Sequence, residues 1–252
     1  MKQERENSLT SQSLADEISH WIGLQVEMAG AKGAVVGMSG GLDSSVTAIL
    51  CNRALADEVR GLILPCHSDP ADEKHARLVA RLFGIKVEKI DLGPVFDILV
   101  RTLPRDGQVP VANVKPRLRM IALYYFANRL DYLVVGAGNK SELMTGYFTK
   151  YGDGGVDILP LGGLLKTQVR ELARELGVPA EIMKKPPSAG LWAGQTDEGE
   201  LGITYEELDR TLRALDSSTA EQAQREVVTI VKEMVSKGHH KRAPIPIYEP
   251  GL

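Results

Sequence analysis

The chain has 252 residues and a formal net charge of −3. This length suits one α/β domain, with or without a helical extension, and can bury a sizeable core. The charge balance gives no sign of nucleic-acid binding, and no apolar run is long enough to cross a bilayer. The two cysteines, Cys51 and Cys66, lack C-x-x-C spacing and the first residues lack an apolar signal core, so we expect a cytoplasmic protein.

Hydrophobic periodicity predicts helices that alternate with strands. An amphipathic helix over 13–29 comes first. Short apolar runs then predict four strands, over 34–38, 61–65, 86–90 and 133–136. Helices are predicted between them, over 43–57, 71–83 and 114–130. This alternation predicts an α/β fold, a Rossmann-like doubly wound parallel sheet flanked by helices, with ligands at the carboxyl ends of the strands.

The last third of the chain is predicted to be a helical extension reached through a long loop. Residues 186–202 are rich in Pro, Gly and small polar residues, and we interpret them as a mobile loop. Trp192 is unusual for a solvated linker and fits either a lid over a ligand or a dimer interface. A helix over 218–236 and a basic, then proline-rich, tail follow. We therefore expect a single domain over 1–252, comprising an N-terminal helix in 1–30, an α/β core in 31–180, the loop, and C-terminal helices and tail in 203–252.

The most informative segment is SGGLDSS at 39–45, between the first predicted strand and the following helix. Glycines there let the backbone approach a phosphate, and the free N–H groups of the helix start point at the anion. The serines add hydroxyl donors. Asp43 would repel a phosphate and therefore indicates a cation between them, for which Mg²⁺ is suited. No Walker A motif occurs. The competing interpretation is a glycine turn in which Asp43 or Ser44 is the N-cap.

This loop resembles the pyrophosphate-binding loop of the N-type ATP pyrophosphatases, which split ATP into AMP and pyrophosphate. Further segments follow the fourth predicted strand: GAGNKSE at 136–142, TGYFTKYGDGGVD at 145–157, LPL at 159–161, and Leu165-Lys166. In this order they are similar to the ammonia-dependent NAD synthetases. The resemblance covers nearly the whole chain, from the first helix to His240-Lys241-Arg242.

The resemblance implies roles for individual residues. Those implied to bind ATP are Gly37, Met38, Ser39, Gly40, Gly41, Leu42, Asp43, Ser44, Ser45, Ala137, Lys166 and Ser188. Those implied to bind the dinucleotide substrate (deamido-NAD) are Arg117, Lys150, Asp157, His240 and Lys241. Mg²⁺ is implied at Asp43 and Glu142, and catalytic roles at Asp43 and Lys166. Ala137 departs from the family, which commonly has Thr there, so backbone must replace a hydroxyl contact to ATP.

Each of these residues also has an ordinary structural interpretation. Glu142 would suit the first turn of an exposed helix, Lys166 a solvated helix start, and the dinucleotide residues surface ion pairs. Tyr147 and Phe148 could stack on the nicotinate ring or lie in the core. We expect the carboxylates of Asp43 and Glu142 to be exposed in a cleft.

The implied reaction makes NAD from nicotinic acid adenine dinucleotide, ATP and ammonia. The nicotinate carboxylate attacks the α-phosphorus of ATP, and ammonia then displaces AMP from the acyl-adenylate. The length leaves no room for a glutaminase domain, so we expect free ammonia as donor, and the resemblance implies a homodimer. The alternatives are another adenylating enzyme, such as a GMP synthetase ATPase subunit or a tRNA-modifying ligase, and a nucleotide sensor without turnover. The unpaired cysteines and the lack of excess basic charge weigh against a tRNA-thiolating ligase. The presence of Asp43, Glu142 and Lys166 weighs against a sensor without turnover.

Overall fold

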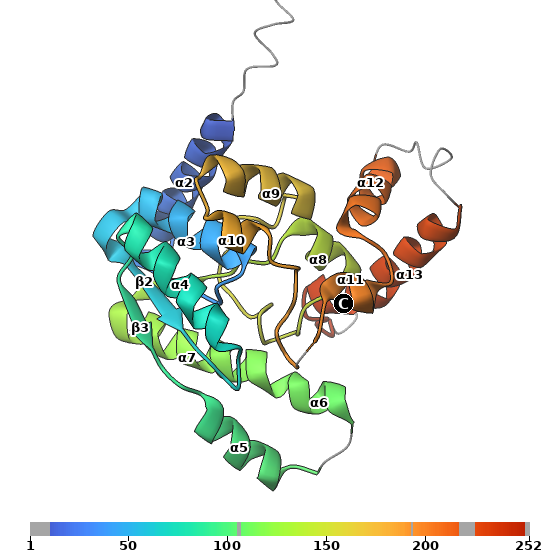
Figure 1. Ribbon diagram of the computed structural model, residues 1–252, viewed down its shortest axis with the longest axis horizontal. Helices are drawn as coiled ribbons and strands as arrows, with labels where there is room; N and C mark the ends of the chain where they lie inside the picture. Colours follow the sequence, from blue (N-terminus) through green and yellow to red (C-terminus); the bar gives the residue numbers. More distant parts are fainter. Residues whose placement is uncertain (1–10, 105–106, 193, 217–224, 250–252) are drawn as a thin grey trace, which may run out of the picture.

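The computed structural model describes residues 11–104, 107–192, 194–216 and 225–249, and its centre is a parallel sheet (Figure 1). The four strands are β1 (Gly33–Gly37), β2 (Val59–Ile63), β3 (Val87–Lys89) and β4 (Tyr132–Val135). Their order is β3-β2-β1-β4, and every neighbouring pair is parallel. The chain winds outward from β1 through β2 to β3 and then returns to the other side of β1. The winding therefore reverses between β1 and β4, the position where such sheets bind ligands.

Helices cover both faces of the sheet because successive strand side chains point to opposite sides. In β1, Ala34 and Val36 belong to one apolar cluster and Val35 to another, and all three are fully buried. The helices that contribute to the first cluster are α2 (Ser11–Met28), α3 (Leu42–Leu55), α4 (Pro70–Phe83), α9 (Lys166–Glu175) and α10 (Ala180–Met183). Those that contribute to the second are α5 (Gly93–Thr102) and α7 (Val114–Leu130). The sheet therefore lies between two layers of helices, and the carboxyl ends of its parallel strands lie together at one edge of the core.

The C-terminal helices have a small apolar core of their own. They are α11 (Asp197–Leu201), α12 (Tyr205–Asp216) and α13 (Arg225–Arg242), and they lie together beside α8 (Lys140–Thr145) in Figure 1. Tyr205, Leu208 and Leu212 of α12 are buried in this cluster. A Cβ added at Gly238 of α13 would come within 2.8 Å of the backbone of Gly146, so only glycine permits this close packing of α13 on the end of α8.

The structure confirms the predicted fold class and corrects the C-terminal part. All four strands and the helices α3, α4 and α7 lie where the periodicity placed them, within two residues at most ends. The helix predicted over 218–236 is wrong at its end, because α13 continues to Arg242 and includes the basic segment assigned to the tail; residues 217–224 lie outside the described ones. Arg242 at the helix end donates hydrogen bonds to the carbonyls of Met144 and Val235.

Several elements were not predicted. They are the short 3-10 helix η1 (Ala56–Glu58), α5, α6 (Gln108–Ala112), α8, α10, α11 and α12. Within 186–202, α11 occupies part of the predicted loop and Gln195 and Asp197 are buried, so the segment is not structureless; its mobility stays a prediction, as does the division into a single domain. In the described parts of the chain, no helix is long and apolar enough to cross a membrane.

Candidate active site

The loop between β1 and α3 presents an uncapped helix N-terminus. The N-cap residue is Gly41, which has no side chain to occupy the first N–H groups of α3. The hydroxyls of Ser44 and Ser45 donate instead to the carbonyl of Gly41, at 3.1 and 2.7 Å. The alternative that Asp43 or Ser44 caps the helix is therefore wrong. An unsatisfied helix start of 14 residues at the carboxyl end of a central strand is suited to an anion such as phosphate.

Gly40 is required in this loop for two reasons. Its φ is +77°, in the left-handed region that disfavours residues with a Cβ. A Cβ there would also lie 2.1 Å from the carbonyl oxygen of Asp72 in α4. The loop is thus held against the start of α4 with no room for a side chain.

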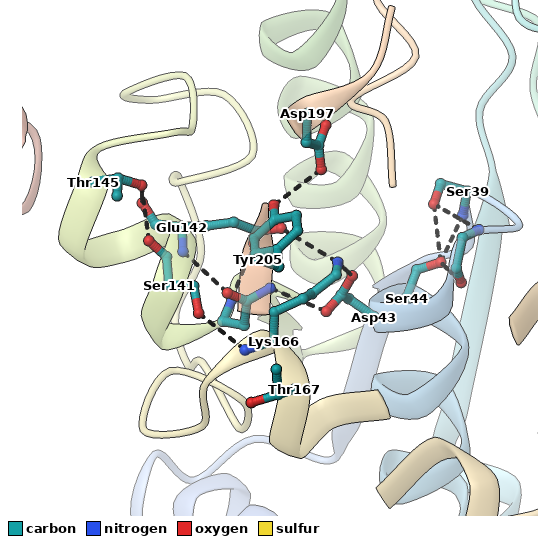
Figure 2. A network of polar contacts seen from close by, with 12 residues as sticks. Ser39, Asp43, Ser44, Ser141, Glu142, Thr145, Lys166, Thr167, Asp197 and Tyr205 are labelled. Carbon is teal, nitrogen blue, oxygen red and sulfur yellow. Dashed lines mark hydrogen bonds and ion pairs between the residues drawn. The ribbon is translucent and has the colours of Figure 1, made fainter. Parts of the chain in front are cut away.

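A cluster of charged side chains lies beside this helix start, as Figure 2 shows. Lys166 forms an ion pair with Asp43, and its Nζ lies 3.8 Å from Oε1 of Glu142. Asn139 Nδ2 donates to Asp43 Oδ1 at 3.1 Å. The four residues come from α3, the turn after β4, α8 and the first turn of α9. The segments after β1 and β4, on either side of the switch point, therefore meet in one site.

The expectation that the two carboxylates are exposed is wrong. The side chains of Asp43 and Glu142 are 16% and 18% exposed, and that of Lys166 is 4% exposed. Burial is tolerated because the lysine lies between the carboxylates and offsets part of their charge. Mutations at these positions must therefore affect folding as well as chemistry.

Glu142 is aimed into the cluster by a local motif. Asn139 Oδ1 accepts from the Glu142 N–H at 3.0 Å, and Glu142 Oε2 accepts from the Asn139 N–H at 3.1 Å. This reciprocal capping box opens α8. The capping box uses Oε2 of Glu142, and the other carboxylate oxygen, Oε1, faces Lys166.

The cluster holds more negative than positive charge. Burial, and then the charge of Asp43, raise the pKa of Glu142 to about 8. Burial by itself would lower the pKa of Lys166. The negative charges of Asp43 and Glu142 together have the larger effect, so the pKa of Lys166 is raised. Burial also raises the pKa of Asp197.

This donor chemistry fits a hard divalent cation. Over the described residues, no group of three or more His, Cys, Asp or Glu side chains is arranged to hold a metal. Two carboxylates beside a helix start that is suited to an anion fit Mg²⁺, which keeps water and substrate phosphates among its ligands.

Two buried residues of the site escaped the sequence analysis. The ring of Tyr205 lies 5.2 Å from Lys166 Nζ, and its hydroxyl donates to Asp197 Oδ2 at 3.0 Å. Both side chains are buried, Tyr205 on α12 and Asp197 at the start of α11. The signal that could have found Tyr205 is its place on the apolar face of a helix, where a hydroxyl needs a partner.

Four of the five residues expected to bind the dinucleotide gather around residues 146–151. Arg117 donates to the carbonyl of Lys150 at 3.4 Å, and Lys150 Nζ donates to the carbonyl of His240 at 2.8 Å. Lys241 Nζ donates to the carbonyls of Gly146 and Phe148, at 2.7 and 2.8 Å. These cations therefore already bind backbone, and substrate contacts by them stay a prediction.

Three other predicted residues have separate surroundings. Asp157 accepts from the Tyr124 hydroxyl at 2.9 Å and from the Val134 N–H at 2.7 Å, which ties it to β4. Ser188 is exposed, and its hydroxyl accepts from the Gly190 N–H at 3.1 Å. Met38 is 3% exposed, and its N–H donates to the carbonyl of Leu62 at 2.8 Å, so a contact with ATP by this residue stays a prediction.

A parallel sheet with an uncapped helix N-terminus and a carboxylate–lysine cluster at its switch point defines an α/β nucleotide-binding protein. Comparison with known families identifies the particular family within this class. The family model described as NAD synthase matches residues 14–245. The chain belongs to the NAD synthase family, as the sequence motifs predicted.

Individual relatives agree with this assignment. The NH(3)-dependent NAD(+) synthetase of Finegoldia magna is 46% identical over 230 residues, which are 91% of this chain and 92% of that protein. The solved NMN synthetase of Francisella tularensis is 35% identical, with a TM-score of 0.88 over 97% of this chain and 100% of that one. The NH3-dependent NAD synthetase of Campylobacter jejuni, solved with a nitrate ion, is 26% identical, with a TM-score of 0.84 over 96% and 100%. The GMP synthetase and tRNA ligase alternatives are not favoured by these matches.

Proposed function

We infer that this protein is an ammonia-dependent NAD synthetase, a carbon–nitrogen ligase. It amidates nicotinic acid adenine dinucleotide with ammonia and converts ATP to AMP and pyrophosphate through an acyl-adenylate. The observation that carries this inference is the Asp43–Lys166–Glu142 cluster beside the uncapped start of α3, in a chain of the NAD synthase family.

In the first step the substrate supplies the nucleophile and the protein supplies position and charge. The triphosphate lies against the N–H groups of α3, with Lys166 as the cation that stabilises negative charge on the departing pyrophosphate. One oxygen of the nicotinate carboxylate attacks the α-phosphorus and the bond to the β-phosphate bridging oxygen breaks. Asp43 holds Lys166 in place, and the backbone at Ala137 serves where the family commonly has a hydroxyl.

In the second step ammonia attacks the carbonyl carbon of the acyl-adenylate. AMP leaves with the electron pair of the broken C–O bond, and the nitrogen loses a proton to give the amide. Residues 186–202 close over the intermediate and exclude water, which would otherwise hydrolyse it. The buried contacts of Gln195 and Asp197 support this role for the loop.

Mg²⁺ is the proposed cofactor, held by Asp43 and Glu142. When bound it neutralises charge on the triphosphate. The excess of carboxylates over cations in the cluster supports the assignment, because a bound cation would offset the negative charge that Lys166 alone does not balance.

We propose a homodimer formed through the face of α5, α6 and α7. Large apolar side chains with 51–61% exposure lie on these helices: Val95, Ile98, Val109, Ile121 and Tyr125. Exposed apolar area of this kind is typical of a subunit interface. Ile121→Glu should shift sedimentation toward the monomer, and Leu82→Glu, at an equally exposed position on α4, should not.

We also propose that the protein is cytoplasmic. The support is that Cys51 and Cys66 are both buried free thiols, which is typical of proteins in a reducing compartment.

The test is to incubate the protein with ATP, Mg²⁺ and the acid dinucleotide, with either ammonium or glutamine as nitrogen donor. We expect NAD, AMP and pyrophosphate in equal amounts with ammonium and none with glutamine. Stoichiometric ADP would contradict the proposed reaction, and NAD from glutamine in ammonia-free buffer would contradict the donor.

A second candidate substrate is the corresponding acid mononucleotide. The high structural similarity to an NMN synthetase motivates it. The curated relatives with higher identity are NAD synthetases, so we expect the dinucleotide to give the larger kcat/KM. A reversed order in parallel assays would reassign the substrate while leaving the chemistry unchanged.

A further inference from the structure

The contact between Glu142 and Lys166 depends on how two separate helices are aligned. Glu142 lies on α8, and Lys166 is the first residue of α9. Their charged atoms lie 3.8 Å apart, a contact too long to align the helices by itself. The chain neighbours of these two residues, Ser141 and Thr167, both contact one side chain, Asp209 of α12.

Asp209 closes a ring of hydrogen bonds between α8 and α9. One of its carboxylate oxygens accepts from the Ser141 hydroxyl, and the other accepts from the Thr167 N–H at 2.8 Å. The Ser141 oxygen in turn accepts from the Lys166 N–H at 2.9 Å. Figure 2 shows Ser141 beside the first turn of α9. Ser141 is next to Glu142, the proposed metal ligand, and Thr167 is next to Lys166, the proposed phosphate contact. Asp209 therefore links the two chain segments that carry these groups.

Burial of the Asp209 carboxylate costs free energy of desolvation unless its hydrogen bonds are made. Its side chain is 1% exposed, and Ser141 is fully buried. Asp209 lies next to Leu208 on the buried side of α12, where an apolar residue would avoid the desolvation of a carboxylate. The N–H of Thr167 at the positive end of α9 offsets that cost.

We propose that Asp209 is a positioning residue of the adenylation step. It acts through Ser141 and Thr167 to set the separation of Glu142 and Lys166, so that the C-terminal extension is part of the catalytic machinery. This inference rests on the proposed function, since the reaction it tunes is the formation of the acyl-adenylate.

The test compares Asp209→Ala and Asp209→Asn with Glu206→Gln. Glu206 is a suitable control because it lies on the same helix and pairs with Arg170 of the same partner helix α9, but at the exposed surface. We expect Asp209→Ala to lower kcat for pyrophosphate release by roughly 10–100-fold, the usual cost of losing a group that orients metal ligands. Asp209→Asn should lose less, because its amide can still accept from Thr167 and contact Ser141. Glu206→Gln should match the wild type.

Two further measurements are needed: the Mg²⁺ dependence separates positioning from simple structural support, and thermal unfolding tests the hydrogen bond itself. The Mg²⁺ concentration for half-maximal rate should rise in both Asp209 variants while the KM for the dinucleotide stays unchanged. In thermal unfolding, Asp209→Ala and Ser141→Ala should be non-additive, because each removes the same hydrogen bond.

The inference is overturned if folded Asp209→Asn and Asp209→Ala keep the wild-type kcat and Mg²⁺ dependence, or if the effects with Ser141→Ala are additive. Should Asp209→Ala fail to fold, the Asn variant decides the question by the same criteria. A wild-type protein that releases no pyrophosphate with either substrate would instead overturn the proposed function, which distinguishes the two failures.

Discussion

The two halves of the site differ in how they are built. The backbone of the loop from Gly37 to Ser45 is shaped mainly by contacts within a few residues, such as those of the Ser44 and Ser45 hydroxyls with Gly41, and by the close approach of Gly40 to Asp72. The cluster of Asp43, Glu142 and Lys166 joins three helices and is supported by a fourth, α12. We call the loop the local half, because it depends on backbone conformation, and the cluster the assembled half, because it depends on the packing of distant elements. Mutations in the two halves should therefore have different effects on rate, stability and KM.

The largest effect should follow loss of the lysine in the assembled half. Lys166→Met leaves Asp43 and Glu142 without the cation that faces both, and in the proposed mechanism it also removes a charge contact to the departing pyrophosphate. We expect pyrophosphate release to fall by about 10³-fold, the upper range for one transition-state contact. Lys237→Met, at a lysine whose side chain is 80% exposed, is the control. Retention of more than a tenth of the wild-type rate would remove Lys166 from the mechanism.

Loss of either carboxylate should rank next. Asp43→Asn and Glu142→Gln should each reduce the rate by about 10²-fold, even at saturating Mg²⁺. For Asp43→Asn we also expect a loss of roughly 3 kcal/mol in the free energy of unfolding, the low end for breaking a buried ion pair, because Lys166 loses this partner but still faces Glu142.

Denaturant unfolding and steady-state kinetics measure both quantities for the carboxylate variants. Asp16→Asn, in an ion pair with Arg53 that is largely exposed, should change neither. Near-normal turnover of Asp43→Asn or Glu142→Gln would show that the affected residue is not a metal ligand.

A glycine pair tests the local half. In Gly40→Ala the new Cβ meets both a positive φ and the carbonyl of Asp72, while in Gly84→Ala a similar φ of +69° is combined with open space. Gly84→Ala should cost about 1–2 kcal/mol of stability, the usual cost of the left-handed conformation for a residue with a Cβ. Gly40→Ala should cost more and raise the KM for ATP about tenfold, since the loop must move from its anion-binding shape. Equal stabilities for the two variants would mean that the approach to α4 is unimportant.

The smallest effect should come from the loop 186–202. Trp192→Ala should raise AMP production relative to NAD by about two- to threefold, because water reaches the intermediate more often while the chemistry is intact. Trp21→Ala changes the other tryptophan, on α2, and is the control. Chromatography of the nucleotide products gives the ratio. An unchanged ratio would leave residues 186–202 as a connection between α10 and α12.

The sequence by itself determined the sheet and the local half of the site. The alternation of short apolar runs with helices specified a parallel sheet, because each buried strand must be followed by a crossover helix. The phosphate loop was predictable because Gly40 and Gly41 act through their own backbone at a strand-to-helix turn. The capping box of Asn139 and Glu142 is equally local and was not predicted, although the pattern N-x-x-E could have indicated it.

Only the tertiary structure decided how the charged groups meet and what supports them. Burial of Asp43 and Glu142 could not be predicted, because it depends on Lys166 folding back from a segment far along the chain. Tyr205 and Asp209 escaped prediction because α12 itself was not predicted, and because their partners lie on three other helices, α8, α9 and α11. Lys241 was predicted as a substrate contact, yet whether it is free to bind depends on carbonyls of residues 146–148 that only the packing of α13 brings near. Side-chain partners across such distances are set by packing, which no local pattern encodes.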